Sequence, residues 1–230
     1  MPIQQMMLGA AGVPPDYSVQ FDSAGEHLIS SSSDYAFGTG DFTAECWIYP
    51  TVINSYHNIF GTRGSYYNST SGWSLGFASN GMMYWYTNGF TILSTNTVST
   101  NTWYHVVAER SGNWGYVFVN GAVWGTANTS SYNLTNSAFR IGDEHSSGSQ
   151  RFIGLISNVR VTKGEAVYDN GYGFTSPTAA LTTTSQSATA SNVKLLCCNG
   201  STVESFTKAS ATLTAGDSNN PPTLSTTYPF

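Results

Sequence analysis

Aromatic side chains that stand near asparagine and serine are the residues of this sequence best suited to binding chemistry. Five of them are Tyr66, Tyr67, Trp73, Trp85 and Trp114. The face of an aromatic ring can stack on the C–H face of a pyranose, while neighbouring amides and hydroxyls bond the sugar hydroxyls. Packing in a core or subunit interface and contact with another protein are the alternative interpretations, because half of the side chains of a sandwich strand point inward.

An acidic pair, Asp143-Glu144, follows an apolar stretch in the middle of the chain. Carboxylate oxygens in a loop, together with backbone carbonyls, are the ligands that Ca²⁺ prefers in proteins. Asp143 and Glu144 are therefore candidate calcium ligands, with a solvated turn as the alternative. We expect no other cofactor.

The remaining residues with catalytic or zinc-binding chemistry lack the necessary spacing. The histidines, at 27, 57, 105 and 145, have neither an i, i+4 partner nor a Cys-x-x-Cys pair beside them. No Gly-x-Ser-x-Gly motif or phosphate-binding loop is present. His105 alternates with Trp103 and Val107, so we predict a hydrogen-bonded core histidine.

The elements that position these residues are predicted to be strands. Residues 41–50 alternate, with Phe42 and Ala44 on one face and Glu45 and Trp47 on the other, which predicts a strand buried on one side and amphipathic on the other. Asn120-Gly121 predicts a two-residue hairpin turn, since both central residues of a type I′ turn need positive φ. The other predicted strands are 72–78, 82–87, 103–110, 116–119, 122–125, 138–142, 152–162 and 193–197, and 182–191 is predicted to be a loop.

The composition supports an all-β class. Charged residues are only 9% and aromatic residues 14% of the 230, and serine, threonine and asparagine supply most of the polarity. This mixture suits strands and turns and excludes helical bundles. The net charge of −5 without a basic run argues against binding to nucleic acid. The first residues predict neither a secretion signal nor a membrane span, and the three cysteines are predicted to be reduced.

Proline pairs near both ends of the sequence predict the domain organisation. Residues 1–16 are expected to form an extended N-terminal arm, 17–216 one β-sandwich, and 217–230 an extended C-terminal tail. Uncharged arms become ordered by adding to a partner. The candidate anchoring residues are Met6, Met7, Leu8, Tyr228 and Phe230.

Four blocks give the sequence a resemblance to the laminin-G-like, concanavalin A-like lectin/glucanase domains. The blocks are DFTAECWIYP at 41–50, WYHVVA leading to YVFVNG at 103–121, FRIG at 139–142 and FIGLISNVRV at 152–161. The resemblance implies a jelly-roll β-sandwich, and related domains bind calcium at the sandwich rim. Related glucanases use paired carboxylates on one strand. Glu45 has no carboxylate at 43 or 47, so we predict that the protein is not an enzyme.

The stretches VTKG at 161–164 and FTSP at 174–177 are similar to copies of this domain in structural proteins of tailed phages, cyanophages especially. The resemblance implies a virion-surface protein assembled in the host cytoplasm. Its expected partners are major capsid or tail proteins and other copies of itself, with no membrane. We therefore predict a non-enzymatic virion structural protein, used in capsid decoration or in the tail. The alternative is an adhesin that binds host surface glycans.

Overall fold

A computed structural model describes residues 17–22, 25–64, 71–87, 89–143, 150–168 and 171–230. Within these ranges the chain forms sixteen β-strands and two single-turn 3₁₀ helices, η1 (Ser33–Tyr35) and η2 (Ser185–Ser187). The strands are β1 (Ser18–Phe21), β2 (Leu28–Ser31), β3 (Phe42–Pro50), β4 (His57–Gly61), β5 (Ser74–Phe77), β6 (Met82–Tyr86), β7 (Phe90–Thr97), β8 (Tyr104–Ser111), β9 (Trp114–Val119), β10 (Ala122–Asn128), β11 (Ala138–Ile141), β12 (Gly154–Lys163), β13 (Val193–Cys197), β14 (Phe206–Ala209), β15 (Thr214–Ala215) and β16 (Thr223–Ser225).

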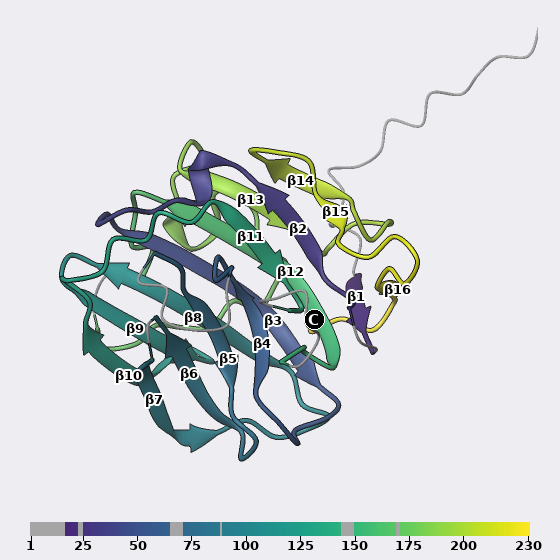
Figure 1. Ribbon diagram of the computed structural model, residues 1–230, viewed down its shortest axis with the longest axis horizontal. Coiled ribbons are helices and arrows are strands. Elements are labelled where there is room, and N and C mark those ends of the chain that lie inside the picture. Colours follow the sequence, from purple (N-terminus) through teal and green to yellow (C-terminus); the bar gives the residue numbers. More distant parts are fainter. Residues whose placement is uncertain (1–16, 23–24, 65–70, 88, 144–149, 169–170) are drawn as a thin grey trace, which may run out of the picture.

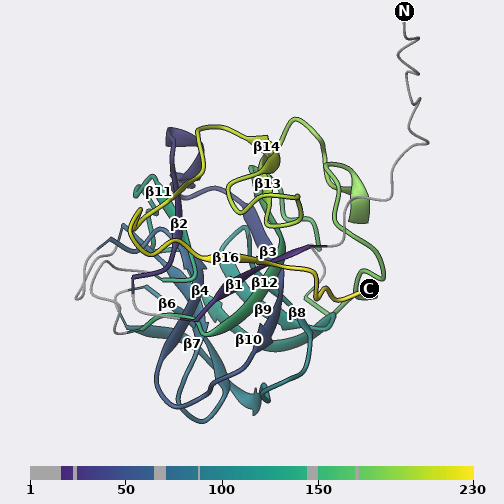
Figure 2. The same ribbon diagram turned by 90° about the vertical axis from the view of Figure 1, so that its right-hand side faces the viewer.

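The strands form two antiparallel sheets that pack face to face as a sandwich (Figures 1 and 2). The larger sheet has the order β10-β9-β8-β3-β12-β1-β16, and β13 and β14 continue it beside the second half of β12. The smaller sheet has the order β15-β2-β11-β4-β5-β6-β7. This arrangement confirms the predicted all-β jelly-roll sandwich.

The core between the sheets is rich in aromatic rings from alternating strand positions. Phe42 lies 5.0 Å from Trp73 and 5.5 Å from Trp85, measured between ring centroids, and the two tryptophans are 5.5 Å apart. All three side chains are buried. Burial of such large apolar groups is the main stabilising contribution to a sandwich of this kind.

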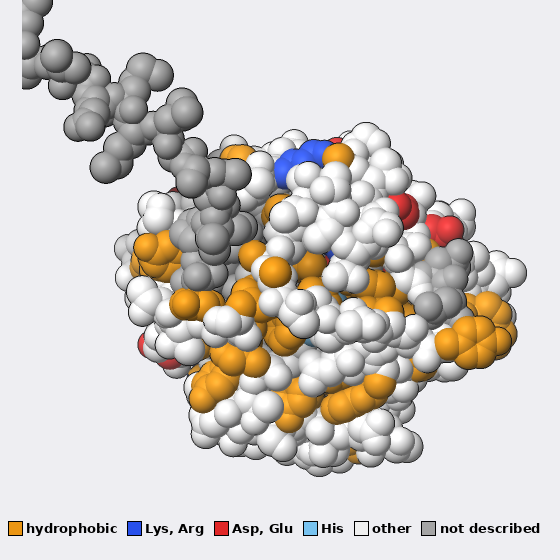
Figure 3. Space-filling view, turned by 180° about the vertical axis from the view of Figure 1, so that it is seen from behind, with side chains coloured by type: hydrophobic (Ala, Val, Ile, Leu, Met, Phe, Trp, Pro, Cys, Tyr) orange, Lys and Arg blue, Asp and Glu red, His pale blue; other side chains and the backbone are white. Residues whose placement is uncertain are grey.

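A long connection, residues 164–168 and 171–192, lies across the outer face of the larger sheet, and we call it the strap. Its Tyr168 and Phe174 rings stack at 3.6 Å and pack on Phe118, while Leu181 and Ala188 pack on Val193 and Leu196. The side of the molecule that carries the strap shows few charged side chains (Figure 3).

The strap explains why strand 41–50 differs from its prediction. Phe42, Ala44, Cys46 and Ile48 point into the core as expected, but Thr43 and Glu45 on the opposite face are also fully buried. The prediction of an amphipathic outer face is therefore wrong, because a distant segment of the chain covers that face.

The predicted Asn120-Gly121 turn is confirmed. Asn120 and Gly121 have φ of 47° and 78°, and Val119 pairs with Ala122 across the hairpin. Gly121 also contacts the strap, since its carbonyl accepts a hydrogen bond from the Phe174 amide at 2.8 Å. A Cβ at this position would collide with the Phe174 carbonyl.

The predicted C-terminal tail, 217–230, is folded onto its own domain. Part of it is β16, which pairs with β1, and Phe230 packs edge-on against Trp47 at 5.4 Å between centroids. Tyr228 and Phe230 each remain about one-third exposed, at 36%. The predicted N-terminal arm, with Met6, Met7 and Leu8, lies outside the described residues. Within the described ranges, no helix has the length and hydropathy needed to cross a membrane.

Candidate functional site

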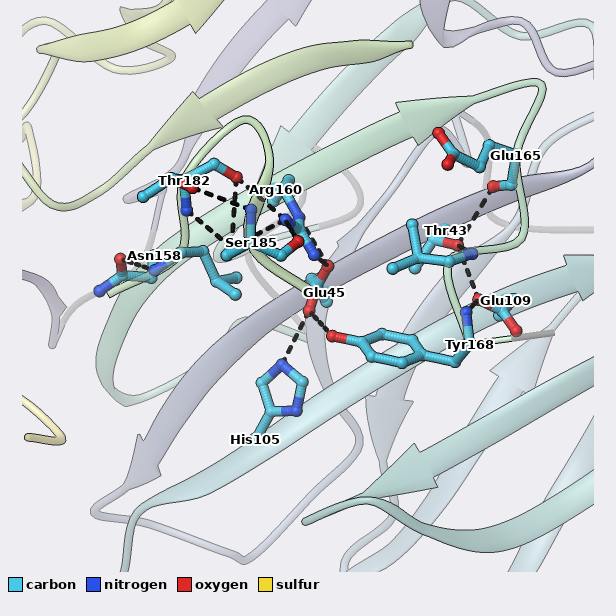
Figure 4. Close-up of polar contacts among 12 residues, drawn as sticks. Thr43, Glu45, His105, Glu109, Asn158, Arg160, Glu165, Tyr168, Thr182 and Ser185 are labelled. Carbon is cyan, nitrogen blue, oxygen red and sulfur yellow. Dashed lines mark hydrogen bonds and ion pairs between the residues drawn. The ribbon is translucent and has the colours of Figure 1, made fainter. Parts of the chain in front are cut away.

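A cluster of ionisable side chains surrounds Glu45 beneath the strap (Figure 4). Arg160 on β12 lies opposite Glu45 in the sheet register, and its Nε and Nη2 are 2.8 and 2.6 Å from Glu45 Oε1. Glu45 Oε2 lies 2.9 Å from Nε2 of His105 on β8 and accepts the Tyr168 hydroxyl at 2.6 Å. The predicted hydrogen-bonded core position of His105 is confirmed.

In this cluster the negative charge of Glu45 is paired with the positive charge of Arg160. Burial alone would raise the pKa of the Glu45 carboxyl, but Arg160, His105 and the Tyr168 hydroxyl together hold that pKa at about 2. Burial, and next the charge on Glu45, raise the pKa of Tyr168, so its hydroxyl stays protonated and donates. Glu45, His105 and Arg160 are fully buried. The cluster has acid–base chemistry but is closed to a substrate.

The same cluster fastens the strap at two places. Arg160 Nη1 donates to the carbonyls of Thr182 and Ser185, at 2.9 and 2.7 Å. On the other side, Glu109 accepts the Thr43 hydroxyl at 2.7 Å and the Tyr168 amide at 2.8 Å (Figure 4). The buried charges therefore connect three sheet strands to the strap, and their role in this structure is positional.

A group of apolar side chains lies on the outer face of the smaller sheet, and we call it the aromatic platform. Tyr56, Phe90 and Leu93 are its exposed members, Tyr86 is half-buried, and Tyr84 is buried. Alternation on β6 directs Met83 and Trp85 into the core and Tyr84 and Tyr86 to the opposite face. The register then places Phe90 beside Tyr86 and Leu93 beside Tyr84.

Phe90 lies at the centre of the aromatic platform. Its ring centroid is 5.6 Å from that of Tyr56, in a stacked arrangement, and 5.3 Å from those of Tyr84 and Tyr86. Phe90, Tyr56 and Leu93 are 47%, 41% and 49% exposed. A folded chain rarely exposes grouped apolar side chains without a binding role, so the platform is the better candidate for ligand contact.

Polar groups border the platform on the side of β4. The Tyr84 hydroxyl donates to Asn58 Oδ1 at 2.8 Å, and Asn58 Nδ2 donates to Gln150 Oε1 at 3.1 Å. Gly76 allows this arrangement, because a Cβ there would collide with the Tyr84 hydroxyl. The Arg63 guanidinium lies 3.9 Å above the Tyr86 ring centroid, a cation–π contact. The platform thus has partly exposed ring faces with the Gln150 amide at their border, while the Asn58 amide is fully buried.

The structure corrects two of the five predicted aromatic contact residues. Trp73 and Trp85 are 0% and 1% exposed, because their strand positions face the core, so they cannot stack on a ligand. Trp114, at the start of β9 in the larger sheet, is 48% exposed but lies outside the platform. Tyr66 and Tyr67 lie outside the described residues. Tyr56 and Phe90, which the prediction missed, are single rings between polar neighbours in the sequence.

The predicted calcium ligands are not supported by the residues around Asp143. Asp143 is buried, and its charge acts on Arg140 and His27. Among the described residues, no group of three or more carboxylate, histidine or cysteine side chains is arranged to hold a metal ion. The described donor set therefore does not fit Ca²⁺, and Glu144 lies outside it.

A surface hollow lies away from the platform. It is a pocket of about 620 Å³ lined by Thr202, Val203, Glu204, Ala215, Ser218, Pro221 and Pro222. Its walls carry no aromatic ring, so it lacks the stacking surface that the platform offers.

The antiparallel sandwich thus carries a partly exposed aromatic face on one sheet and a closed charge cluster on the other. Residues 22–166 match the family model described as the concanavalin A-like lectin/glucanases superfamily, with the laminin G type of domain. The match covers more than half of the sequence, and the chain belongs to this superfamily. Among curated protein sequences, none matches the chain significantly.

Solved structures share the fold at low sequence identity. A candidate carbohydrate-binding protein of Bacteroides ovatus is 17% identical, with a TM-score of 0.66 over 92% of this chain, and this chain spans only 60% of that protein. The heptameric SAP-like pentraxin of Limulus polyphemus is 20% identical, with a TM-score of 0.55 over 90% of this chain and 94% of its own. The CBM40 of the Ruminococcus gnavus IT-sialidase is 11% identical, with a TM-score of 0.52 over 65% and 90%.

Proposed function

We propose that the chain is a non-catalytic carbohydrate-binding domain and that the aromatic platform is its binding surface. The observation that carries the proposal is the half-exposed Phe90 ring at the centre of three tyrosine rings. Ring faces carry partial negative charge and attract the weakly positive C–H groups on one face of a pyranose. The half-buried Gln150 amide lies at the border, where it suits the sugar hydroxyls.

The buried positions of two carboxylates support a non-catalytic role. Glu45 and Glu109, the carboxylates of the larger sheet's β3 and β8, are both fully buried and hydrogen-bonded to the strap or sheet. A glycosidase needs two carboxyl groups that flank the scissile bond. Neither of these carboxylates can reach a sugar.

Two of the structural neighbours carry names that refer to carbohydrate binding or to a sialidase module. Their identity to this chain is too low to assign a ligand, so they support only the type of function. We expect the platform residues to determine which sugar is bound.

The proposal is tested by glycan-array screening followed by calorimetric titration of the best-binding glycan. Phe90→Ala is expected to weaken binding at least about tenfold, or about 1.4 kcal/mol. Trp114→Ala removes a ring of similar exposure outside the platform and should bind like the wild type. Equal loss in both variants, or no binding of any glycan by the wild type, would contradict the proposal.

We also propose that the domain is displayed on a phage particle, where glycan binding would aid attachment to the host. The support is the similarity of the 161–164 and 174–177 stretches to phage structural proteins, together with the sparsely charged surface of Figure 3. Capsid or tail proteins would be its partners. Because Phe230 packs on Trp47 of its own domain, anchoring is assigned to residues 1–16 alone.

The display proposal is tested on purified particles. Mass spectrometry should detect the chain, and a variant lacking residues 1–16 should be lost from the particles while it still folds. Full occupancy by that variant would contradict anchoring by the arm.

A further inference from the structure

The chain passes from the smaller sheet to the larger sheet between β15 and β16, just before the segment 223–230. β15 belongs to the smaller sheet and pairs with β2, whereas β16, eight residues later, is an edge strand of the larger sheet and pairs with β1. In Figure 2 the yellow segment crosses the molecule beside β1 before it reaches the end marked C. The connection between them contains Pro221-Pro222, which favours an extended backbone.

The contacts that hold this segment are few and local. Three residue pairs join β16 to β1, the Ser18 hydroxyl donates to the Thr227 carbonyl at 2.6 Å, and Phe230 contacts Trp47. All eight residues of 223–230 are exposed or half-buried. Segments with so little buried apolar surface open at low free-energy cost.

The surface beneath residues 223–230, which we call the seat, is more deeply buried than the segment that covers it. It contains the fully buried Ser18 and Val19 of β1 and the nearly buried Trp47. A hollow of about 220 Å³ lies at the segment's border with β1 and β12, lined in part by Leu155 and Thr227. An opened seat would expose the β1 edge and the Trp47 ring, and an open sheet edge recruits another strand.

We propose that this seat accepts the 223–230 segment of a second copy, so that two copies exchange β16. A strand that fills the seat needs Leu224 opposite Val19 and an aromatic ring six residues later on Trp47. The same segment of another copy meets both requirements without any new contact, which is the general basis of strand exchange. Residues 218–230 carry no charged side chain, so repulsion between like-charged side chains does not oppose the exchange.

The experiment uses the register pair Gln20 and Thr223. Full-length chains with Gln20→Cys are mixed with full-length chains with Thr223→Cys, warmed briefly, cooled and oxidised with glutathione disulfide. Two protein thiols and one glutathione disulfide give one interchain disulfide and two molecules of reduced glutathione, so a covalent dimer with one chain of each type is expected. Its yield should rise with protein concentration, and light scattering of the wild type should show a matching dimer.

Two controls make the result interpretable. The Gln20→Cys/Thr223→Cys double variant at low concentration should form the disulfide within one chain, which shows that the geometry permits the bond. Mixing Gln20→Cys with Ser130→Cys, an exposed site elsewhere, should give no dimer above background. Mixtures that stay monomeric at every concentration, while the double variant closes internally, would overturn the proposal. So would a wild-type dimer seen by light scattering when the mixed cysteine variants form no 20–223 cross-link.

Discussion

The Glu45 carboxylate and the Arg160 guanidinium form a fully buried ion pair between neighbouring strands, with N–O distances of 2.6 and 2.8 Å. The remaining donors of Arg160 reach the strap carbonyls, and the remaining oxygen of Glu45 meets His105 and Tyr168. The pair therefore joins the outer face of the larger sheet to a segment far along the chain.

Removing one partner of this pair should be costly. Arg160→Met leaves Glu45 buried without its main counter-charge, and we expect the free energy of unfolding to fall by about 3–5 kcal/mol. Adding Glu45→Met should restore part of the loss. Lys194→Met, which removes a cation bonded only to a nearby carbonyl, is the control and should change little. Urea denaturation is measured for the wild type, the Arg160→Met and Glu45→Met single variants, their double variant and the Lys194→Met control. Additive effects of the two core substitutions would contradict the coupling.

Tyr168→Phe should weaken the attachment of the strap to the larger sheet while the ring at position 168 stays in place. The variant keeps the stack on Phe174 but loses the hydroxyl that donates to Glu45 at 2.6 Å, a bond to a charged acceptor with a value of about 1.5–3 kcal/mol. Hydrogen exchange is expected to quicken in the strap and to stay unchanged in β4–β7. Unchanged exchange in the strap would show that the hydroxyl does not hold it.

Acid should destabilise the fold through His27. Its Nδ1 lies 2.9 Å from the Gly25 carbonyl and must donate there, so Nε2 accepts from Arg140 at 2.8 Å and the ring is neutral. Burial lowers the pKa of His27 from 6.5, with the nearby Arg140 charge also opposing protonation. The unfolded chain therefore binds the proton more readily, and folding stability falls as the pH drops through about 6.5.

The measurement is the urea midpoint at pH 7.5 and pH 5.5. His27→Gln keeps an acceptor for Arg140 but cannot titrate, so its midpoint should fall less than that of the wild type. Burial lowers the pKa of His57 as well, so part of the acid effect should remain in the variant. An identical fall in both chains would contradict the role given to His27.

Much of the fold could be predicted from local patterns. The strands whose apolar residues alternate, such as β3, β6 and β8, and the Asn120-Gly121 turn follow from the sequence, because period-two burial and positive φ are local properties. β7 was missed, since FTILSTNT is largely polar and gains its place by pairing with β6.

The strap and the platform depend on contacts that no local pattern contains. Burial of Glu45 requires Arg160, His105 and Tyr168, which are far away in the sequence. The alternation of residues 83–86 indicates that one pair of rings faces inward, but only the register with β7 places Tyr84 and Tyr86 beside Phe90 on the outer face.

A crystal structure of the chain with the glycan that binds best tests the central claim most directly. A pyranose ring is expected to stack on Phe90 or Tyr56, with a hydroxyl directed to Gln150. A sugar bound instead in the pocket beside Glu204 and Pro222, with the platform uncovered, would contradict it.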